Sequence, residues 1–208
     1  MKTIAVISQK GGAGKTTIAV HLAVAAERAG RSCAIVDLDP QASATTWKDL
    51  RKDETPAVVS AQPARLAQVL ETASKHGADL VIIDSAPHSE TAALAAARLA
   101  DLVLIPCRPA ILDLRAIHAS VDLVKLAGKP GCIVLNAVPP RGGLGDDATE
   151  AVADYGLPVA PVRLSHRAAF LHCLTAGQTA QEYEPDGKAA EEVLQLYKWT
   201  CKHVGVKA

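Results

Sequence analysis

A glycine-rich segment near the N-terminus constrains the fold of this chain more than any other feature. Residues 10–17 read Lys-Gly-Gly-Ala-Gly-Lys-Thr-Thr, and they join a short apolar run at 3–8 to an alanine-rich run of helical length at 16–29. Glycines in a strand-to-helix turn let successive backbone N–H groups point inward, and the N-terminus of the following helix adds partial positive charge. The segment therefore predicts a phosphate-binding loop, in which Lys15 reaches the β- and γ-phosphate oxygens and Thr16 supplies a hydroxyl to Mg²⁺. The predicted nucleotide-binding residues of this loop are Lys10, Gly11, Gly12, Ala13, Gly14, Lys15, Thr16 and Thr17.

Short apolar runs alternate with segments of helical length along the rest of the chain. The expected strands lie at 3–8, 33–37, 80–84, 102–106 and 132–137, with a further one near 158–164. The expected helices lie at 16–29, 64–76, 90–99 and 111–126, near 168–176 and near 187–203. Because this alternation is typical of a parallel sheet with helices on both faces, we expect an α/β fold of the P-loop NTPase type. It would be a three-layer sandwich with a mostly parallel sheet of about seven to eight strands, and residues 1–208 would form a single domain.

Composition and charge exclude several classes of protein. Lysine plus arginine and aspartate plus glutamate both number 22, so no overall charge draws the chain to nucleic acid or anionic lipid. No apolar run approaches the ~18 residues of a membrane span, so no stable membrane association is expected. The five cysteines have no spacing typical of zinc or redox sites, which indicates buried reduced thiols. We therefore expect a cytoplasmic protein.

Carboxylates follow two of the expected strands. Asp37 and Asp39 stand at i and i+2 where the run 33–37 ends, and Asp84 ends the run 80–84. Because side chains two residues apart on leaving a strand share one orientation, both carboxylates can face the mouth of the sheet. An apolar strand that ends in aspartate, downstream of a phosphate-binding loop, is typical of the Walker B element that holds Mg²⁺. A second interpretation of Asp39 stays open, in which it begins an Asp-Pro turn and caps the next helix.

Lys10 distinguishes the loop from the general P-loop pattern, which has glycine where this chain has Gln9. The motif Lys-Gly-Gly-x-Gly-Lys-Thr-Thr resembles the deviant Walker motif of the ParA/MinD family, and the resemblance extends over almost the whole chain. It implies that Lys10 crosses a dimer interface and touches the nucleotide held by the other subunit. It also implies that Asp39 positions or activates the attacking water, and that Asp37 supports the Mg²⁺ shell around Asp84.

Three later segments bear on the same resemblance. Residues 85–87 (Ser-Ala-Pro) depart from the two prolines that the family often has after this aspartate, so the shape of the segment is not predicted. Residues 104–109 resemble the proline pair that shapes a dimer-facing loop. Residues 135–141 resemble the adenine-side strand and loop, where Asn136 would hydrogen-bond the base and Pro139 would pack on its face. An asparagine at a strand end is also a common turn former, and that interpretation stays open.

The resemblance implies a function in moving or placing a cargo. The run Asp39-Pro40-Gln41-x-Ser43-x₃-Trp47 resembles the small plasmid-encoded ParA proteins that lack an N-terminal DNA-binding domain. For such proteins, ATP closes a homodimer, and the dimer binds double-stranded DNA of the nucleoid without sequence preference. A centromere-binding ParB-like adaptor then stimulates an otherwise slow, Mg²⁺-dependent ATP hydrolysis, which drives plasmid or chromosome partition. Three alternatives stay open: a MinD-like ATPase at the membrane surface, an ATPase that positions a protein cargo, and a metabolic or assembly ATPase on the same scaffold.

Direct signals for DNA binding are few. Residues 193–208 carry Lys198, Lys202 and Lys207 but no Asp or Glu, and Arg163 and Arg167 lie in a segment that resembles the DNA-facing region of the family. A few cations per subunit predict weak, salt-sensitive binding that dimerisation strengthens. A solvated helix face explains the same lysines without any ligand. The apolar stripe of this helix is typical of a core-docking face rather than a lipid anchor, and it consists of Val193, Leu194, Tyr197, Cys201 and Val204.

Overall fold

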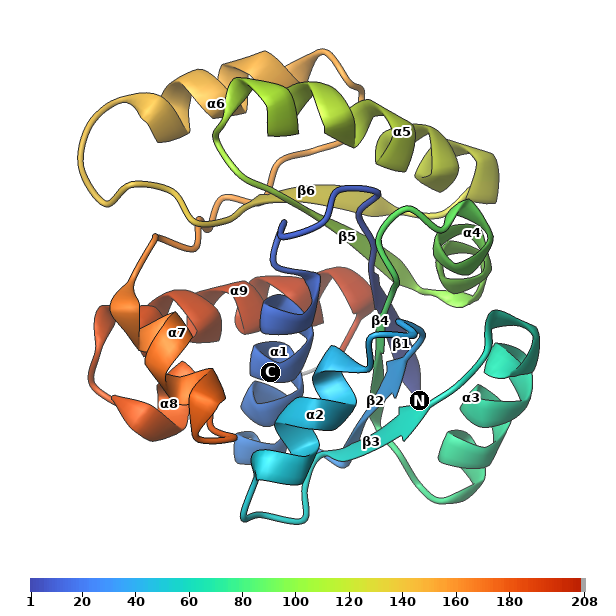
Figure 1. The fold of residues 1–208 in the computed structure, drawn as a ribbon. Coiled ribbons are helices and arrows are strands. Elements are labelled where there is room, and N and C mark those ends of the chain that lie inside the picture. Colours follow the sequence, from blue (N-terminus) through green and yellow to red (C-terminus); the bar gives the residue numbers. More distant parts are fainter. Residues whose placement is uncertain (207–208) are drawn as a thin grey trace.

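Six parallel strands form one sheet in the computed structural model of this protein, which describes residues 1–206 (Figure 1). Across the sheet they follow the order β3-β2-β4-β1-β5-β6, and every neighbouring pair is parallel. Their bounds are β1 (Lys2–Val6), β2 (Cys33–Asp37), β3 (Ala57–Ser60), β4 (Leu80–Asp84), β5 (Leu102–Cys107) and β6 (Gly131–Leu135). The first strand therefore lies inside the sheet, between β4 and β5, and the glycine-rich loop leaves from its carboxyl end.

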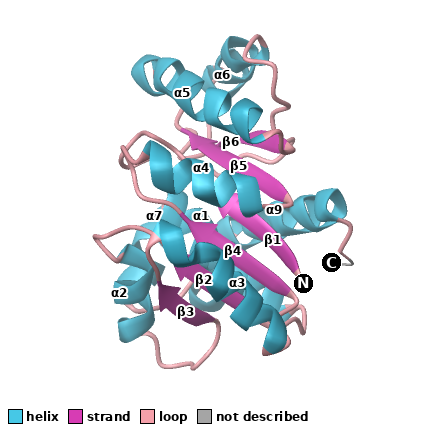
Figure 2. Cartoon of the chain, turned by 90° about the vertical axis from the view of Figure 1, so that its right-hand side faces the viewer, coloured by secondary structure: helices cyan, strands magenta, loops and turns pink. Residues whose placement is uncertain are grey.

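Helices cover both faces of the sheet (Figures 1 and 2). On one face lie α1 (Lys15–Arg28), α2 (Ser43–Leu50), α7 (Ala168–Thr175), α8 (Ala180–Tyr183) and α9 (Lys188–Val204). On the other lie α3 (Leu66–Lys75), α4 (Glu90–Leu99), α5 (Ile111–Ala127) and α6 (Leu144–Ala153), with the short 3₁₀ helix η1 (Pro63–Arg65) before α3. The expected three-layer α/β architecture with a parallel sheet is confirmed.

The alternation of side chains along β1 shows how one strand serves both layers. Ile4 and Val6 belong to the core beneath α1 and α9, while Ala5 and the following Ile7 belong to the core beneath α4 and α5. All four side chains are buried. A central strand of a parallel sheet must be apolar on both faces, which is why these strands read as continuous apolar runs without a polar alternation.

The expected count of seven to eight strands is wrong for the described residues, which form six. The run 158–164 contains Pro158 and Pro161 and makes only one isolated bridge, Ile133↔Val159, and a second bridge, Val138↔Ser165, follows directly after it. A proline has no N–H to donate to a ladder, so two of them in seven residues prevent a regular edge strand. Conversely, strand β3 was not expected from the sequence. It has only four residues, and most of them are exposed at the edge of the sheet.

The helices α2, α6 and α8 were also not expected from the sequence. Helices α2 and α8 are short, and both α2 and α6 begin in polar or glycine-containing stretches that predict turns. All the helices that the sequence did predict are present, and their ends differ from the predicted ends by at most a few residues.

The register of the sheet brings polar groups together at its carboxyl edge. Asp37 of β2 lies directly beside Asp84 of β4, and Asp84 in turn lies beside Val6, the last residue of β1. The edge where parallel strands end is the general ligand-binding edge of open α/β sheets. The glycine-rich loop and both carboxylates therefore meet at one place.

Candidate nucleotide-binding site

The glycine-rich loop has a backbone conformation that its glycines permit. Gly12 and Gly14 have positive φ angles of 72° and 97°, a region that side chains other than glycine rarely adopt. Gly14 is required for a second reason, since a Cβ at this position would stand 2.0 Å from Nδ2 of Asn136. Gly14 is also the N-cap residue of α1 and no side chain caps this helix, so its first N–H groups are left for an anionic ligand.

Lys15 lines a cavity of about 450 Å³ beside this loop. Its side chain is buried, and Nζ donates a hydrogen bond of 3.3 Å to the carbonyl oxygen of Lys10. Burial lowers the pKa of Lys15, while the charges of Asp84 and Asp39 raise it. The cavity is lined by Gly12, Gly14, Lys15, Thr16, Thr17, Asp39, Ser43, Thr46, Trp47, Leu50, Pro87 and Leu174.

Thr16 and Asp84 form a pair with one unused ligand atom. The Thr16 hydroxyl donates a 2.6 Å hydrogen bond to Oδ2 of Asp84, while Oδ1 is buried without a hydrogen-bond partner among the described residues. Burial raises the pKa of Asp84 to about 7, against the opposing effect of the Thr16 hydrogen bond. A buried carboxylate oxygen without a partner, next to a hydroxyl, suits a hard divalent cation such as Mg²⁺, which takes oxygen ligands. The residues present thus fit the predicted metal site.

Replacing Asp84 with asparagine is expected to stabilise the protein without nucleotide or metal at pH 8, by on the order of 2–4 kcal/mol. The folded-state pKa of Asp84 is raised above the unfolded value, so this carboxyl favours folding below pH ~4 and loses that contribution as pH rises through 7. The gain should accordingly be small at pH 4 and full at pH 8 in denaturant titrations with a chelator. Asp154→Asn, at an exposed position, is the matched control. A destabilised Asp84→Asn at both pH values would contradict this account of Asp84.

Asp37 is a helix cap in this structure. It is fully buried, its Oδ1 accepts the N–H of Asp39 at 3.0 Å, and its Oδ2 accepts the N–H groups of Ala44 and Thr45 at 3.1 Å each. The Thr45 hydroxyl also donates to Oδ2 at 3.3 Å. Asp37 thereby fixes the start of α2, a role that the sequence did not suggest. Its predicted place in the Mg²⁺ shell stays a prediction.

Asp39 lines the cavity that also holds Lys15 and Thr16. Its Oδ1 accepts the N–H of Gln41 at 2.9 Å, and its carbonyl oxygen accepts the N–H of Ala42 at 2.8 Å. Asp39 therefore does begin a turn, as the second interpretation held, but Asp37 is the residue that caps α2. The half-buried Asp39 carboxylate still faces the same cavity as Lys15, where the predicted role in orienting water would require it.

Lys10 is held by an acidic side chain of its own subunit. Its Nζ lies 3.6 Å from Oδ1 of Asp113 in the first turn of α5, and Arg108 approaches the other oxygen of Asp113 at 3.8 Å. Asp113 was missed at the sequence level, because nothing in its local pattern distinguishes it from an ordinary first-turn aspartate. The Lys10 side chain is 42% exposed, so it is accessible to a second molecule.

Asn136 contacts the loop through a different bond from the predicted one. Its Nδ2 donates a hydrogen bond of 2.8 Å to the carbonyl oxygen of Ala13, which ties the end of β6 to the phosphate-binding loop. Pro139 is exposed three residues later. The predicted contacts of Asn136 and Pro139 with the adenine base stay predictions.

The residues predicted to contact DNA differ in whether their charges are already paired. Arg163 pairs with Asp146 at 2.8 Å, and Arg167 pairs with Glu192 at 2.6 Å, so neither presents an unpaired charge. Lys198 and Lys202 are exposed on α9 and have no ion-pair partner within residues 1–206. Lys207 lies outside the described residues. The predicted contacts of all four residues with DNA stay predictions, and of the four only the α9 lysines present an unpaired charge within the described residues.

Comparison with known proteins places this site in a family. A family model described as the CobQ/CobB/MinD/ParA nucleotide binding domain matches residues 4–178. The chain is 34% identical over 213 residues to maintenance of carboxysome distribution protein A of Gloeobacter kilaueensis, and 28% identical over 204 residues to the protein of that name from Halothiobacillus neapolitanus. Each of these alignments covers 93% of this chain and 94% of the relative. The chain is also 34% identical over 127 residues to protein ParA of Rhizobium radiobacter, which covers 60% of this chain and 56% of that protein.

A solved structure supports the same grouping at the level of the fold. The septum site-determining protein MinD of Pyrococcus horikoshii, complexed with Mg-ADP, matches with a TM-score of 0.79 and 21% identity, over 100% of this chain and 98% of that one. None of the helices in residues 1–206 has both the length and the apolar character needed to cross a membrane. The family match over most of the chain confirms the resemblance that Lys10 and the loop motif suggested: this chain belongs to the CobQ/CobB/MinD/ParA nucleotide-binding family.

Proposed function

We propose that this chain is a Mg²⁺-dependent ATP hydrolase that positions a cargo by cycling on and off DNA. ATP closes two copies into a dimer, the dimer binds double-stranded DNA without sequence preference, and an adaptor on the cargo stimulates hydrolysis and release. The observation that carries the proposal is the meeting of the loop, Lys15, the Thr16–Asp84 pair and Asp39 around one cavity. The Mg-ADP complex of a protein with the same fold supports the choice of nucleotide.

The residues of the cavity divide the chemistry among them. Lys15 and the open N-terminus of α1 bind the phosphates, and Thr16 with Asp84 would hold Mg²⁺, which neutralises phosphate charge when it is bound. Asp39 orients the attacking water. Lys15 is the one cation in the lining of the cavity, and no arginine of the described chain lies there to stabilise the transition state. A slow intrinsic rate follows, because such an arginine accelerates phosphoryl transfer by orders of magnitude.

The relatives bear on the nature of the cargo. The two carboxysome distribution proteins align over 94% of their own length, so we propose a large protein body, bound through an adaptor, as the cargo. Plasmid or chromosome partition with a ParB-like adaptor is the second candidate, and the shorter ParA alignment supports it. Deleting the gene in its source organism separates them: uneven spacing of protein bodies supports the first, and plasmid loss with normal spacing supports the second.

The membrane-surface alternative loses its main support in the structure. Of the apolar stripe on α9, Val193, Tyr197, Cys201 and Val204 are at most 4% exposed and pack into the core beneath α1, while Leu194 alone among its five members is exposed, at 44%. Side chains that are already buried in the core are not available to enter a lipid surface.

Replacing Lys10 with alanine is expected to leave ATP affinity within about threefold of the parent and to abolish the ATP-dependent dimer. The reason is that the Lys10 ammonium pairs with Asp113 in the single chain and Lys10 is not among the residues that line the cavity, so its proposed contact is with the nucleotide of the second copy. Light scattering at saturating ATP measures the dimer. Lys48→Ala removes a lysine outside the loop and is the control, and an intact ATP dimer of Lys10→Ala would contradict the cross-subunit role.

DNA binding is tested by fluorescence anisotropy of a random-sequence duplex with ADP or ATP at two salt concentrations. Binding that requires ATP and weakens with salt is expected. Lys198→Glu should weaken it by about 5-fold or more, because the charge change is doubled in a dimer. Arg98→Glu on α4 changes charge on the opposite face and serves as the matched control. Absence of binding with either nucleotide would remove DNA from the proposal and leave the ATPase.

A further inference from the structure

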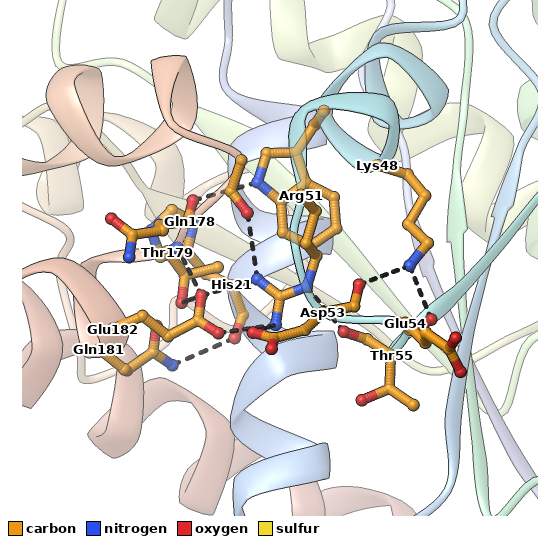
Figure 3. A network of polar contacts seen from close by, with 12 residues as sticks. His21, Lys48, Arg51, Asp53, Glu54, Thr55, Gln178, Thr179, Gln181 and Glu182 are labelled. Carbon is orange, nitrogen blue, oxygen red and sulfur yellow. Dashed lines mark hydrogen bonds and ion pairs between the residues drawn. The ribbon is translucent and has the colours of Figure 1, made fainter.

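A polar network joins the helix that follows Asp39 to the C-terminal helices (Figure 3). Helix α2 begins four residues after Asp39, and its first turn is held by Asp37, which accepts three hydrogen bonds from Ala44 and Thr45. The segment 38–42 therefore connects the end of β2 to the start of α2. The N–H of Asp39 donates to Asp37, and its carbonyl oxygen accepts the N–H of Ala42, the N-cap residue of α2, so a shift of α2 acts on Asp39 through this turn.

The carboxyl end of α2 is fixed by Arg51. Its guanidinium forms a two-pronged pair with Glu182, with Nη1 to Oε2 at 2.9 Å and Nη2 to Oε1 at 2.6 Å. Nη1 also donates to the carbonyl oxygen of Gly177 at 3.1 Å, and Nε donates to that of Thr55 at 2.7 Å. The Arg51 side chain is 5% exposed and that of Glu182 is 15% exposed. Water therefore screens this pair little.

A second contact along α2 reaches the same C-terminal segment. Trp47 donates from Nε1 to the carbonyl oxygen of Gln178 at 3.0 Å, and the Arg51 guanidinium stands 5.0 Å above the Trp47 ring. Trp47 also lines the cavity that holds Lys15 and Asp39. A Cβ on Gly177 would lie 2.5 Å from the backbone nitrogen of Arg51, so the two segments approach as closely as backbones can.

Glu182 connects in turn to the helix of the phosphate-binding loop. It forms a capping box with Thr179, whose N–H and hydroxyl both donate to Oε2 of Glu182. The next residue, Ala180, donates its N–H to Nε2 of His21 at 3.0 Å, and Nδ1 of His21 lies 2.7 Å from the carbonyl oxygen of Thr17. Burial lowers the pKa of His21 to about 4, so the ring is neutral and Nδ1–H donates to Thr17. The network thus runs from α1 through α8 to the end of α2.

A buried ion pair is a poor way to gain stability, because the cost of desolvating two charges offsets most of their attraction. What a two-pronged pair does supply is a defined geometry. We infer that Arg51 and Glu182 are positioning residues for Asp39, and that through them the C-terminal helices control ATP hydrolysis. The control of hydrolysis rests on the proposed function, whereas the positioning of the segment 38–42 is a property of the chain without nucleotide.

Hydrogen exchange of the nucleotide-free protein tests the positioning. Arg51→Met, which keeps length and apolar stem, is expected to speed amide exchange in residues 38–46 by about 10-fold or more. Exchange in the central strands β1 and β4 should not change. Arg98→Met, at an exposed arginine of α4, is the matched control. Unchanged exchange at 38–46 in Arg51→Met would overturn the inference whether or not the chain hydrolyses ATP.

Kinetics of the same variants test the control of hydrolysis. In Arg51→Met, kcat should fall by about 10-fold while the Kd for ATP stays within about threefold, because Lys15 and the loop are untouched. A fall in affinity with unchanged kcat would overturn it.

Global unfolding of Arg51→Met and a parent chain that hydrolyses no ATP can each be told apart from failure of the inference. Arg51→Met could exchange rapidly throughout because it is globally unfolded, and the positioning is then tested with Glu182→Gln. Glutamine keeps the size of the side chain and an oxygen that can accept the hydrogen bonds of the α8 cap. Glu182→Gln should therefore show faster amide exchange in residues 38–46 alone. If the parent chain hydrolyses no ATP, the proposed function fails while the exchange result still decides the positioning. Slower hydrolysis with unchanged exchange would show an effect by another route and overturn the inference.

Discussion

Replacing Lys15 with alanine is expected to lower the affinity for Mg-ATP by about 100-fold or more. Lys15 is the one cation in the cavity lining, it is buried, and its Nζ already stands 3.3 Å from the Lys10 carbonyl oxygen on the inner side of the loop. Its removal leaves the phosphates facing the carboxylates of Asp84 and Asp39, so the loss includes new repulsion as well as lost attraction.

Calorimetric titration of the variant with ATP in excess Mg²⁺ measures this loss. Lys10→Ala is the matched control, since it removes the same charge from the same loop and should bind ATP normally. The variant should remain folded, because Lys15 supports no core packing and its loss relieves a buried charge. Parent-like ATP affinity in a folded Lys15→Ala protein would show that the cavity is not the nucleotide site.

Replacing Asp39 with alanine is expected to reduce the hydrolysis rate by about 100-fold or more while ATP still binds, so that an ATP-bound dimer accumulates. The carboxylate faces the cavity from the loop before α2. The helix itself keeps its cap, because Asp37 supplies it. The loss should therefore fall on the chemical step rather than on binding.

Single-turnover hydrolysis and light scattering with ATP measure the two parts of this prediction. Asp39→Asn is the matched variant, since its side-chain oxygen can still accept the N–H of Gln41 and preserve the turn. If Asp39 acts through its charge on water, both variants are slow. A parent-like rate in Asp39→Asn would assign the effect to the turn and contradict the role in hydrolysis, and a monomeric Asp39→Ala at saturating ATP would contradict the trapped dimer.

The parts of the fold that were predictable are those with strong local signals. Central strands such as β1 and β4 contain continuous apolar runs (residues 4–6 and 80–83) because both of their faces are buried, and this makes them recognisable without a structure. The edge strand β3 and the short helix α2 have no such signal, since their residues are half exposed and acquire order from neighbours. For the run 158–164 the sequence predicted a strand that does not form. Its apolar residues are typical of a strand, but its two prolines prevent regular pairing.

The candidate site likewise has a part that was predictable from the sequence and a part that was not. Gly14, Lys15 and Thr16 are adjacent in the chain, so their spacing alone specified how they would meet a phosphate. The capping role of Asp37, the pairing of Lys10 with Asp113 and the neutralisation of Arg167 by Glu192 join residues from different elements. No local pattern encodes such contacts.

By itself, the sequence determined the parallel α/β class, because apolar runs and segments of helical length alternate along it. It also predicted the phosphate-binding loop and the family, because their motifs consist of residues within a few positions of one another. Only the tertiary structure decided which carboxylate caps α2, which cations have partners, and how Arg51 reaches Glu182 across 131 positions of the chain. The physical reason is that a charge or a hydrogen-bonding group acts on whatever lies within a few ångströms of it, and in a folded chain that distance is set by packing and not by separation along the sequence.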